Sequence, residues 1–277
     1  MSVQHPALAP SDNAQHAVVP HAAEAPNALF EYLLRLGDDR LILGHRLGEW
    51  CGHGPILEED IATSNVALDL LGQATMFLRL AGEVEGKGRD EDALAYFREA
   101  VQFRNCQLVE LPKGDFAVTI ARQFLFDVYA VVTLDALSRS TNAGIAAIAA
   151  KSLKEAKYHV RHSGEWVLRL GDGTEESHRR IQKAFDSLWR FTNELFVMDD
   201  VDRSLLDDGV SVDLAALRPQ WEALLRDVIA RATLTLPNDV PRPTNARGGR
   251  TGAHTEFLGH LLAEMQIVAR SHPGATW

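Results

Sequence analysis

The 277-residue sequence lacks several features that mark common classes of protein. It has only two cysteines, Cys51 and Cys106, which are too few for a disulfide framework and suit a reducing compartment. No run of about 18 apolar residues is free of charge, because Arg122 and Asp127 interrupt the richest stretch, residues 116–137. The sequence therefore argues against a secreted scaffold and a membrane span. We expect a cytoplasmic protein with Cys51 in its core.

Basic residues are scarce as well. The sequence has 28 Lys and Arg against 38 Asp and Glu, a formal net charge of −10. A general nucleic-acid binder needs a basic face, so this charge argues against that class. The nucleophile elbow Gly-x-Ser-x-Gly, the phosphate-binding loop and the dinucleotide fingerprint after a strand are absent too. Small anionic ligands remain compatible, because they need only a local cluster of arginines.

The first 26 residues are rich in Ala, Pro and His, and no Lys or Arg precedes an apolar block. This pattern is not that of a secretory signal, and it predicts a disordered extension. Residues 27–277 are expected to form one helical domain. The tail histidines, His5, His16 and His21, are expected to be solvated rather than to bind metal.

Helical periodicity dominates the remaining chain, and no convincing run of strands is present. Four long helices are predicted at residues 27–50, 58–82, 116–137 and 143–170. Shorter helices are predicted at residues 92–98, 174–196, 214–233 and 254–270, with loops at 199–213 and 237–252. Long helices joined by short turns predict an all-α antiparallel bundle with additional C-terminal helices. Helices of this length are typical of the ferritin-like class.

Four helices of that class can hold two metal ions. Such a site takes one carboxylate from each of two helices and a Glu-x-x-His step from each of the other two. The candidate ligands on the four long helices are Glu49, Asp69, Asp127 and His159. The position three residues after Asp69 is Gly72, and the position three before His159 is Ala156. Because neither residue has a ligand atom, two of the six ligands are missing.

Two alternatives stay open from the residues alone. The four remaining groups could bind a single metal, and Glu155 lies on the same helix face as His159, four residues before it. Alternatively, the polar residues form a hydrogen-bonded network, with Lys157 or Arg122 balancing the charge, because a buried acid must be paired.

Two further histidines and one glycine-rich segment are predicted to take no part in chemistry. His178 and His254 lie near predicted helix starts, where we expect them to be solvated. The segment Gly248-Gly249-Arg250 has no strand to support it and is predicted to be a loop.

Several short strings occur together along the chain. They are Leu36-Gly37-Asp38, Arg46 to His53, Leu68 to Ala74, Ile120 to Gln123, Lys154 to His159, Leu188 to Thr192, His254-Thr255-Glu256 and Leu262 to Gln266. In this combination they closely resemble the C-subunit family of bacterial phenylacetyl-CoA epoxidases, multicomponent ring 1,2-epoxygenases. The resemblance covers about residues 29–277. Any one string alone would be a weak signal.

The resemblance implies a complex similar to the bacterial multicomponent monooxygenases. A catalytic A-type subunit holds the di-iron centre, and a C-type chain of the same ferritin-like class pairs with it. A B-type subunit bridges the assembly, and a reductase with FAD and an iron–sulfur cluster delivers electrons from NADPH. The product is an epoxide of phenylacetyl-CoA. The resemblance further implies that this chain holds no cofactor, has no catalytic residue and acts structurally.

The resemblance also assigns the candidate ligands. Glu49, Asp69 and Asp127 fall on carboxylate positions of the catalytic subunit. Gly72 falls on the first histidine, Ala156 on a glutamate and His159 on the second histidine. The matched glutamate is therefore an alanine, and Glu155 is not its equivalent. This assignment favours a vestigial metal site over a working one.

The family further suggests contact with the CoA ester near the subunit boundary. The matching positions are Gln102, Phe103, Arg104, Asn105, Arg203, Ser204 and Leu205. Either arginine could pair with a CoA phosphate, although both segments could equally be solvated loops. Two other functions stay open, a mononuclear metal oxidase using the residual ligands and a generic ferritin-like scaffold.

Overall fold

The computed structural model describes residues 27–237 and 248–275, and the predicted extension with its three histidines lies outside the described residues. The α-helices are α1 (Ala28–Gly48), α2 (Leu57–Glu85), α3 (Glu91–Tyr96), α4 (Gln107–Glu110), α5 (Phe116–Leu137), α6 (Ala143–Gly171), α7 (Glu175–Leu188), α8 (Asp200–Leu206), α9 (Leu214–Arg231) and α10 (Glu256–Ser271). Three 3₁₀ helices are η1 (Ala100–Gln102), η2 (Trp189–Phe196) and η3 (Gly249–Thr251). These ranges contain no strand, which confirms the predicted all-α, ferritin-like bundle.

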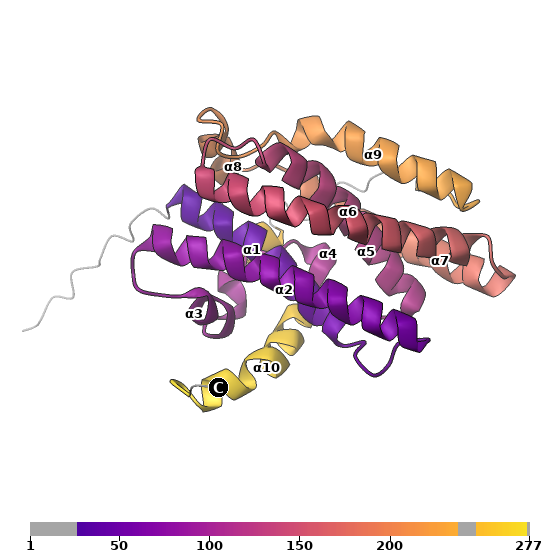
Figure 1. The fold of residues 1–277 in the computed structure, drawn as a ribbon, viewed down its shortest axis with the longest axis horizontal. Helices are drawn as coiled ribbons and strands as arrows, with labels where there is room; N and C mark the ends of the chain where they lie inside the picture. The colour runs from indigo at the N-terminus through magenta and orange to yellow at the C-terminus, as the bar shows by residue number, and fades with distance from the viewer. Residues whose placement is uncertain (1–26, 238–247, 276–277) are drawn as a thin grey trace, which may run out of the picture.

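The four long helices form two antiparallel pairs, α1 with α2 and α5 with α6. In Figure 1, α2 and α6 lie toward the viewer, with α1 and α5 behind them. Glycines of α1 allow α2 to approach closely. A Cβ added at Gly37 would lie 2.8 Å from Leu78 Cδ2, and one at Gly44 would lie 3.1 Å from Leu71 Cγ. The α1–α2 contact therefore depends on small residues along one face of α1.

Helix α5 is the central helix of the bundle. It is long and apolar enough to cross a membrane by length and composition, but 89% of its apolar window is buried inside the fold. Helices α6, α7 and α9 pack against it. Burial by protein on nearly all sides explains why its sequence is apolar all round, as expected for a core helix.

Side-chain caps define the helix starts that the sequence predicts most sharply. Asn27 Oδ1 accepts from the Leu29 amide at 3.0 Å and begins α1. Asp115 caps α5 and Asn142 caps α6 in the same way. These caps satisfy amides that the first helical turn cannot pair internally. The predicted bounds of α5 agree with the structure, and those of α6 agree to within one residue.

Other local predictions are wrong. The expected loop at 199–213 contains α8, which Asp199 caps. Cys51, expected in the core, is exposed, because α1 ends at Gly48 and the chain turns outward. The helix expected over residues 174–196 changes to 3₁₀ geometry at Trp189.

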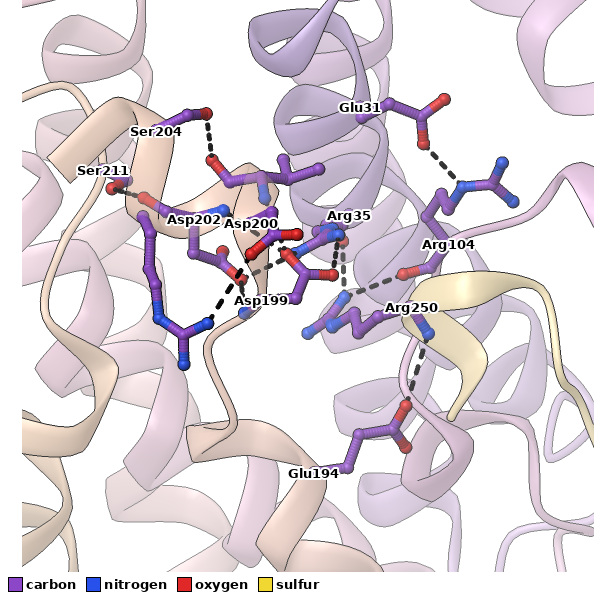
Figure 2. Close-up of polar contacts among 12 residues, drawn as sticks. Glu31, Arg35, Arg104, Glu194, Asp199, Asp200, Asp202, Ser204, Ser211 and Arg250 are labelled. Carbon is purple, nitrogen blue, oxygen red and sulfur yellow. Dashed lines mark hydrogen bonds and ion pairs between the residues drawn. The ribbon is translucent and has the colours of Figure 1, made fainter. Parts of the chain in front are cut away.

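Buried ion pairs connect α1 to distant parts of the chain. Asp39 accepts two hydrogen bonds from Arg250, at 2.7 and 2.9 Å, and Asp38 pairs with Arg98. Arg35 donates to Asp199 and Asp202 at the start of α8, and Figure 2 shows this cluster beside Arg250. These pairs dock α8, η3 and the segment that follows α3 onto α1.

Two predictions fail within the same network. The sequence predicts that Gly248-Gly249-Arg250 is a loop, yet Gly249 to Thr251 form η3 and Arg250 is the counterion of the buried Asp39. The sequence predicts a solvated His254, yet its ring lies 2.7 Å from the fully buried carboxylate of Glu110. Both partners are far away in sequence, so helical periodicity carries no sign of them.

Candidate functional site

A hydrogen bond between His159 of α6 and Asp69 of α2 joins the two helices near their middles. His159 Nε2 lies 3.0 Å from Asp69 Oδ2. The His159 side chain is only 2% exposed, whereas Asp69 is 42% exposed. The pair therefore extends from the solvent edge of α2 into the interior.

Asp127, a buried acid on α5, lies near His159 in the interior of the bundle. Asp127 accepts hydrogen bonds from Ser163 Oγ and from Gln123 Nε2, both at 2.7 Å. Ser163 Oγ also lies 2.9 Å from the His159 carbonyl oxygen, which connects this acid to the His159 turn of α6. Burial raises the pKa of Asp127 from 3.8 to about 6, although nearby His159 and the two hydrogen bonds favour its charged form.

The cations predicted to balance this acid lie elsewhere. Lys157 is exposed on α6. Arg122 is fully buried, but its Nη1 donates to the carbonyls of Leu111 and Pro112, at 2.5 and 3.1 Å. Burial lowers the pKa of Arg122 to about 10. Asp127 is therefore held by neutral hydrogen-bond donors, and Arg122 anchors the turn before α5.

The remaining predicted positions do not converge on this cluster. Glu49 follows the last residue of α1 and accepts from Arg46 at 2.6 Å. Gly72 lies on the exposed face of α2, where an added Cβ would meet no atom within 4 Å. Ala156 is buried on α6. The structure thus brings Asp69, His159 and Asp127 together and leaves Glu49 and Gly72 apart from them.

This donor set does not fit a metal. A di-iron site of the bundle class takes about six ligands. Within residues 27–237 and 248–275, no three His, Cys, Asp or Glu side chains are grouped so that they could hold an ion. The one histidine and its aspartate are hydrogen-bonded to each other instead. The same geometry weakens the mononuclear alternative, because Glu49 is bound to Arg46.

Glu155 does not pair with His159. Its Oε2 accepts from Gln73 Nε2 at 2.9 Å, and Gln73 Oε1 accepts from Arg40 Nε at 3.0 Å. Sequence reasoning missed Gln73 and Arg40, and it also missed Gln123 and Ser163. Gln73, Gln123 and Ser163 had a readable signal, because each lies four residues from a candidate ligand on the same helix face.

The first predicted CoA segment is largely enclosed. Phe103 and Asn105 are fully buried, and Asn105 Nδ2 donates to Glu110 at 2.8 Å. Gln102 caps η1 through the Glu99 amide. Arg104 Nε lies 2.6 Å from Glu31, and this pair is visible in Figure 2. This segment is not a solvated loop, and its arginine already has a carboxylate partner.

The second predicted segment is more open. Arg203 is 65% exposed, with Asp200 3.7 Å away, and Ser204 Oγ donates to the Val201 carbonyl at 2.9 Å. Leu205 packs against the core. Arg250 Nη1 donates to the carbonyls of Arg35 and Arg104, and Arg35 in turn contacts Asp199 and Asp202. Both predicted CoA segments therefore lie beside the N-terminal half of α1 (Figure 2). Of the two arginines, Arg203 is the one free to meet a ligand.

Comparison with known proteins connects this arrangement to one family. A family model described as phenylacetic acid catabolic protein matches residues 14–277. The chain belongs to this family. Within the curated proteins, it is 50% identical over 251 residues to the C subunit of the 1,2-phenylacetyl-CoA epoxidase of Escherichia coli (strain K12). The match covers 91% of this chain and all of the relative. The family resemblance predicted from the sequence is confirmed.

The raised pKa of Asp127 predicts a specific pH dependence of stability. The unfolded chain releases this proton near pH 3.8 and the folded chain near pH 6, so stability falls as the pH rises between these values. Two pH units correspond to about 3 kcal/mol. Asp127→Asn removes the charge, and both contacts can persist: Oδ1 accepts from Gln123, while Nδ2 donates to Ser163 Oγ, which then donates to the His159 carbonyl. We expect it to be more stable than the wild type at pH 7.5 by about 1–3 kcal/mol, and the difference to shrink toward pH 4.

Urea unfolding between pH 4 and 7.5 measures this difference. Asp135→Asn, at an exposed position of the same helix, is the matched control and should show little change across this range. A difference for Asp127→Asn that stays constant with pH, or that is larger at pH 4, contradicts the assignment.

Proposed function

We propose that this chain is the non-catalytic structural subunit of a multicomponent phenylacetyl-CoA 1,2-epoxidase in aerobic phenylacetate breakdown. It pairs with the subunit that holds the di-iron centre and stabilises it. The observation that carries the proposal is the His159–Asp69 hydrogen bond beside an Asp127 bound by neutral donors. Of the residual ligands, His159 and Asp69 thus bind each other and Asp127 binds Gln123 and Ser163, in a chain that is 50% identical to the C subunit of a phenylacetyl-CoA epoxidase.

The other parts of the reaction belong to partner subunits in this proposal. The di-iron subunit activates oxygen, and a B-type subunit bridges the assembly. A reductase with FAD and an iron–sulfur cluster supplies electrons from NADPH. The residual acids and His159 hold this chain's own helices together. His159 connects α6 to α2, and Asp127 connects α5 to α6 through Ser163.

A second part of the proposal concerns the substrate. Phenylacetyl-CoA lies near the subunit boundary, with its phosphates close to α8 and the N-terminal half of α1. The exposed guanidinium of Arg203 supports this placement, because its pair with Asp200 is long and solvated. Arg104 would have to leave Glu31 before it could bind a phosphate.

Replacing the histidine separates a structural role from a catalytic one. We expect His159→Ala to lower the free energy of unfolding by about 1–3 kcal/mol, because a buried hydrogen bond between α2 and α6 is lost. Turnover of the assembled complex should stay within about twofold of wild type. The matched control is His178→Ala, which removes a partly buried contact to the Gly171 carbonyl, outside the α2–α5–α6 cluster.

Epoxide formation, complex size and thermal unfolding are measured on the same samples. Loss of turnover in a fully assembled and stable His159→Ala complex would show direct chemistry in this chain and refute the structural role.

Replacing Arg203 tests the substrate contact. Arg203→Ala should raise the KM for phenylacetyl-CoA of the complex by roughly two- to fivefold with kcat unchanged, because an exposed phosphate contact contributes up to about 1 kcal/mol. Arg139→Ala removes an equally exposed arginine at the end of α5 and should leave KM unchanged. Equal KM values for the two variants would exclude the contact.

A further inference from the structure

We propose that the outer face of α2 and α6 is the surface on which the di-iron subunit docks, through an apolar helix of that subunit flanked by acidic residues. This inference rests on the proposed function and adds the surface and the chemistry of its partner. Two features of the described residues carry it, an apolar row on α2 and an unpaired cationic row on α6.

The apolar row runs along the outside of α2. Leu57 is 72% exposed, Ile61 53% and Leu68 65%. The spacing of four and seven residues places them on one helix face. The other exposed residues between Ile61 and Thr75 are Asn65 and Gly72. The one acid in this part of the row, Asp69, is 42% exposed and is hydrogen-bonded to His159. From residue 57 to 75 it spans about 27 Å, the length of a docked helix rather than of a small ligand.

The cationic row runs along the outside of α6. Its members, all exposed, are Lys151, Lys154, Lys157 and Arg161. None forms an ion pair with any residue in the described ranges. Three of the six lysines of the whole sequence lie here, in a chain whose formal net charge is −10. Tyr158 lies among them at 49% exposure, with the Arg161 guanidinium 5.7 Å from its ring centre.

The two rows belong to one continuous surface. The bonds from Asp69 to His159 and from Gln73 to Glu155, about one turn apart, hold α2 beside α6. Lys151 Nζ also lies 3.8 Å from Met76 Sδ of α2. In Figure 1 no described helix lies in front of α2 or α6. Gly72 has no side chain on this face, and no atom lies within 4 Å of the position its Cβ would take, so a partner could approach the α2 backbone there.

Charge complementarity decides the occupant. A row of cations beside an apolar row matches a protein helix with an apolar face and acidic flanks. A second copy of this chain that placed α6 against α6 would bring like charges together. Nucleic acid is disfavoured by the overall negative charge and gains nothing from Leu57 and Leu68.

The two rows are expected to affect binding kinetics differently. Apolar side chains that become buried in the interface mainly set the dissociation rate, whereas charges at its edge mainly set the association rate and its salt dependence.

Binding to the purified di-iron subunit tests the proposal, with full-length chain and kinetics recorded at low and high salt. Leu68→Asp should weaken affinity by at least about 50-fold, mainly through faster dissociation. Lys151→Glu combined with Lys154→Glu and Lys157→Glu should slow association about tenfold at low salt and flatten its salt dependence. Thermal unfolding of each variant should match wild type, because all four positions are exposed.

Matched variants on α9 provide the controls. Leu224→Asp changes an apolar residue of 44% exposure, and Arg226→Glu with Arg231→Glu reverses two exposed charges. Both controls should bind within about twofold of wild type.

The outcomes separate the two proposals. If wild-type chain does not bind the di-iron subunit, the proposed function fails. If it binds and the α2–α6 variants bind as well as the α9 controls, the function stands and this docking surface is wrong. A third outcome also overturns the proposal. If the chain self-associates, Leu68→Asp abolishes this self-association and binding to the di-iron subunit is unchanged, the face belongs to a second copy of the chain.

Discussion

A charge that is buried in this bundle is stable only when a partner within the chain meets it. Helix α1 shows the consequence most clearly, because Arg35, Asp38, Asp39 and Arg40 are four buried charged residues within six positions. Their partners come from α8, the segment after α3, η3 and α2. The requirement to pair these charges therefore determines where the short C-terminal elements dock. It also accounts for the polar centre of a mostly apolar fold.

The same requirement is met by hydrogen bonds at the polar residues in the interior of the bundle. Asp127 is held by an amide and a hydroxyl, and burial raises its pKa to about 6, so that the neutral acid predominates below that pH. His159 is held by Asp69, which reaches solvent. Each of these groups therefore has hydrogen-bond partners from the chain itself.

The parts of the fold that depend on local signals could be predicted from the sequence. The start of α5 follows from Asp115 and the start of α6 from Asn142, because a cap and its helix are adjacent. The pairs Asp39–Arg250 and Glu110–His254 could not be predicted, since their members are 211 and 144 residues apart. The candidate site was found in part. Helical spacing located Asp69, Asp127 and His159, but it does not show that Glu49 lies past the end of α1 or that Gly72 faces outward.

The central claim is that the residual acids and His159 stabilise this chain while a partner holds the iron. Iron analysis of the purified chain, expressed alone in iron-rich medium, tests it most directly when the same chain is then analysed in complex with the di-iron subunit. The account predicts well below 0.1 iron per isolated chain, and about two irons per pair of subunits in the complex. About two irons bound by the isolated chain, with oxygen activation by that chain alone, would contradict it.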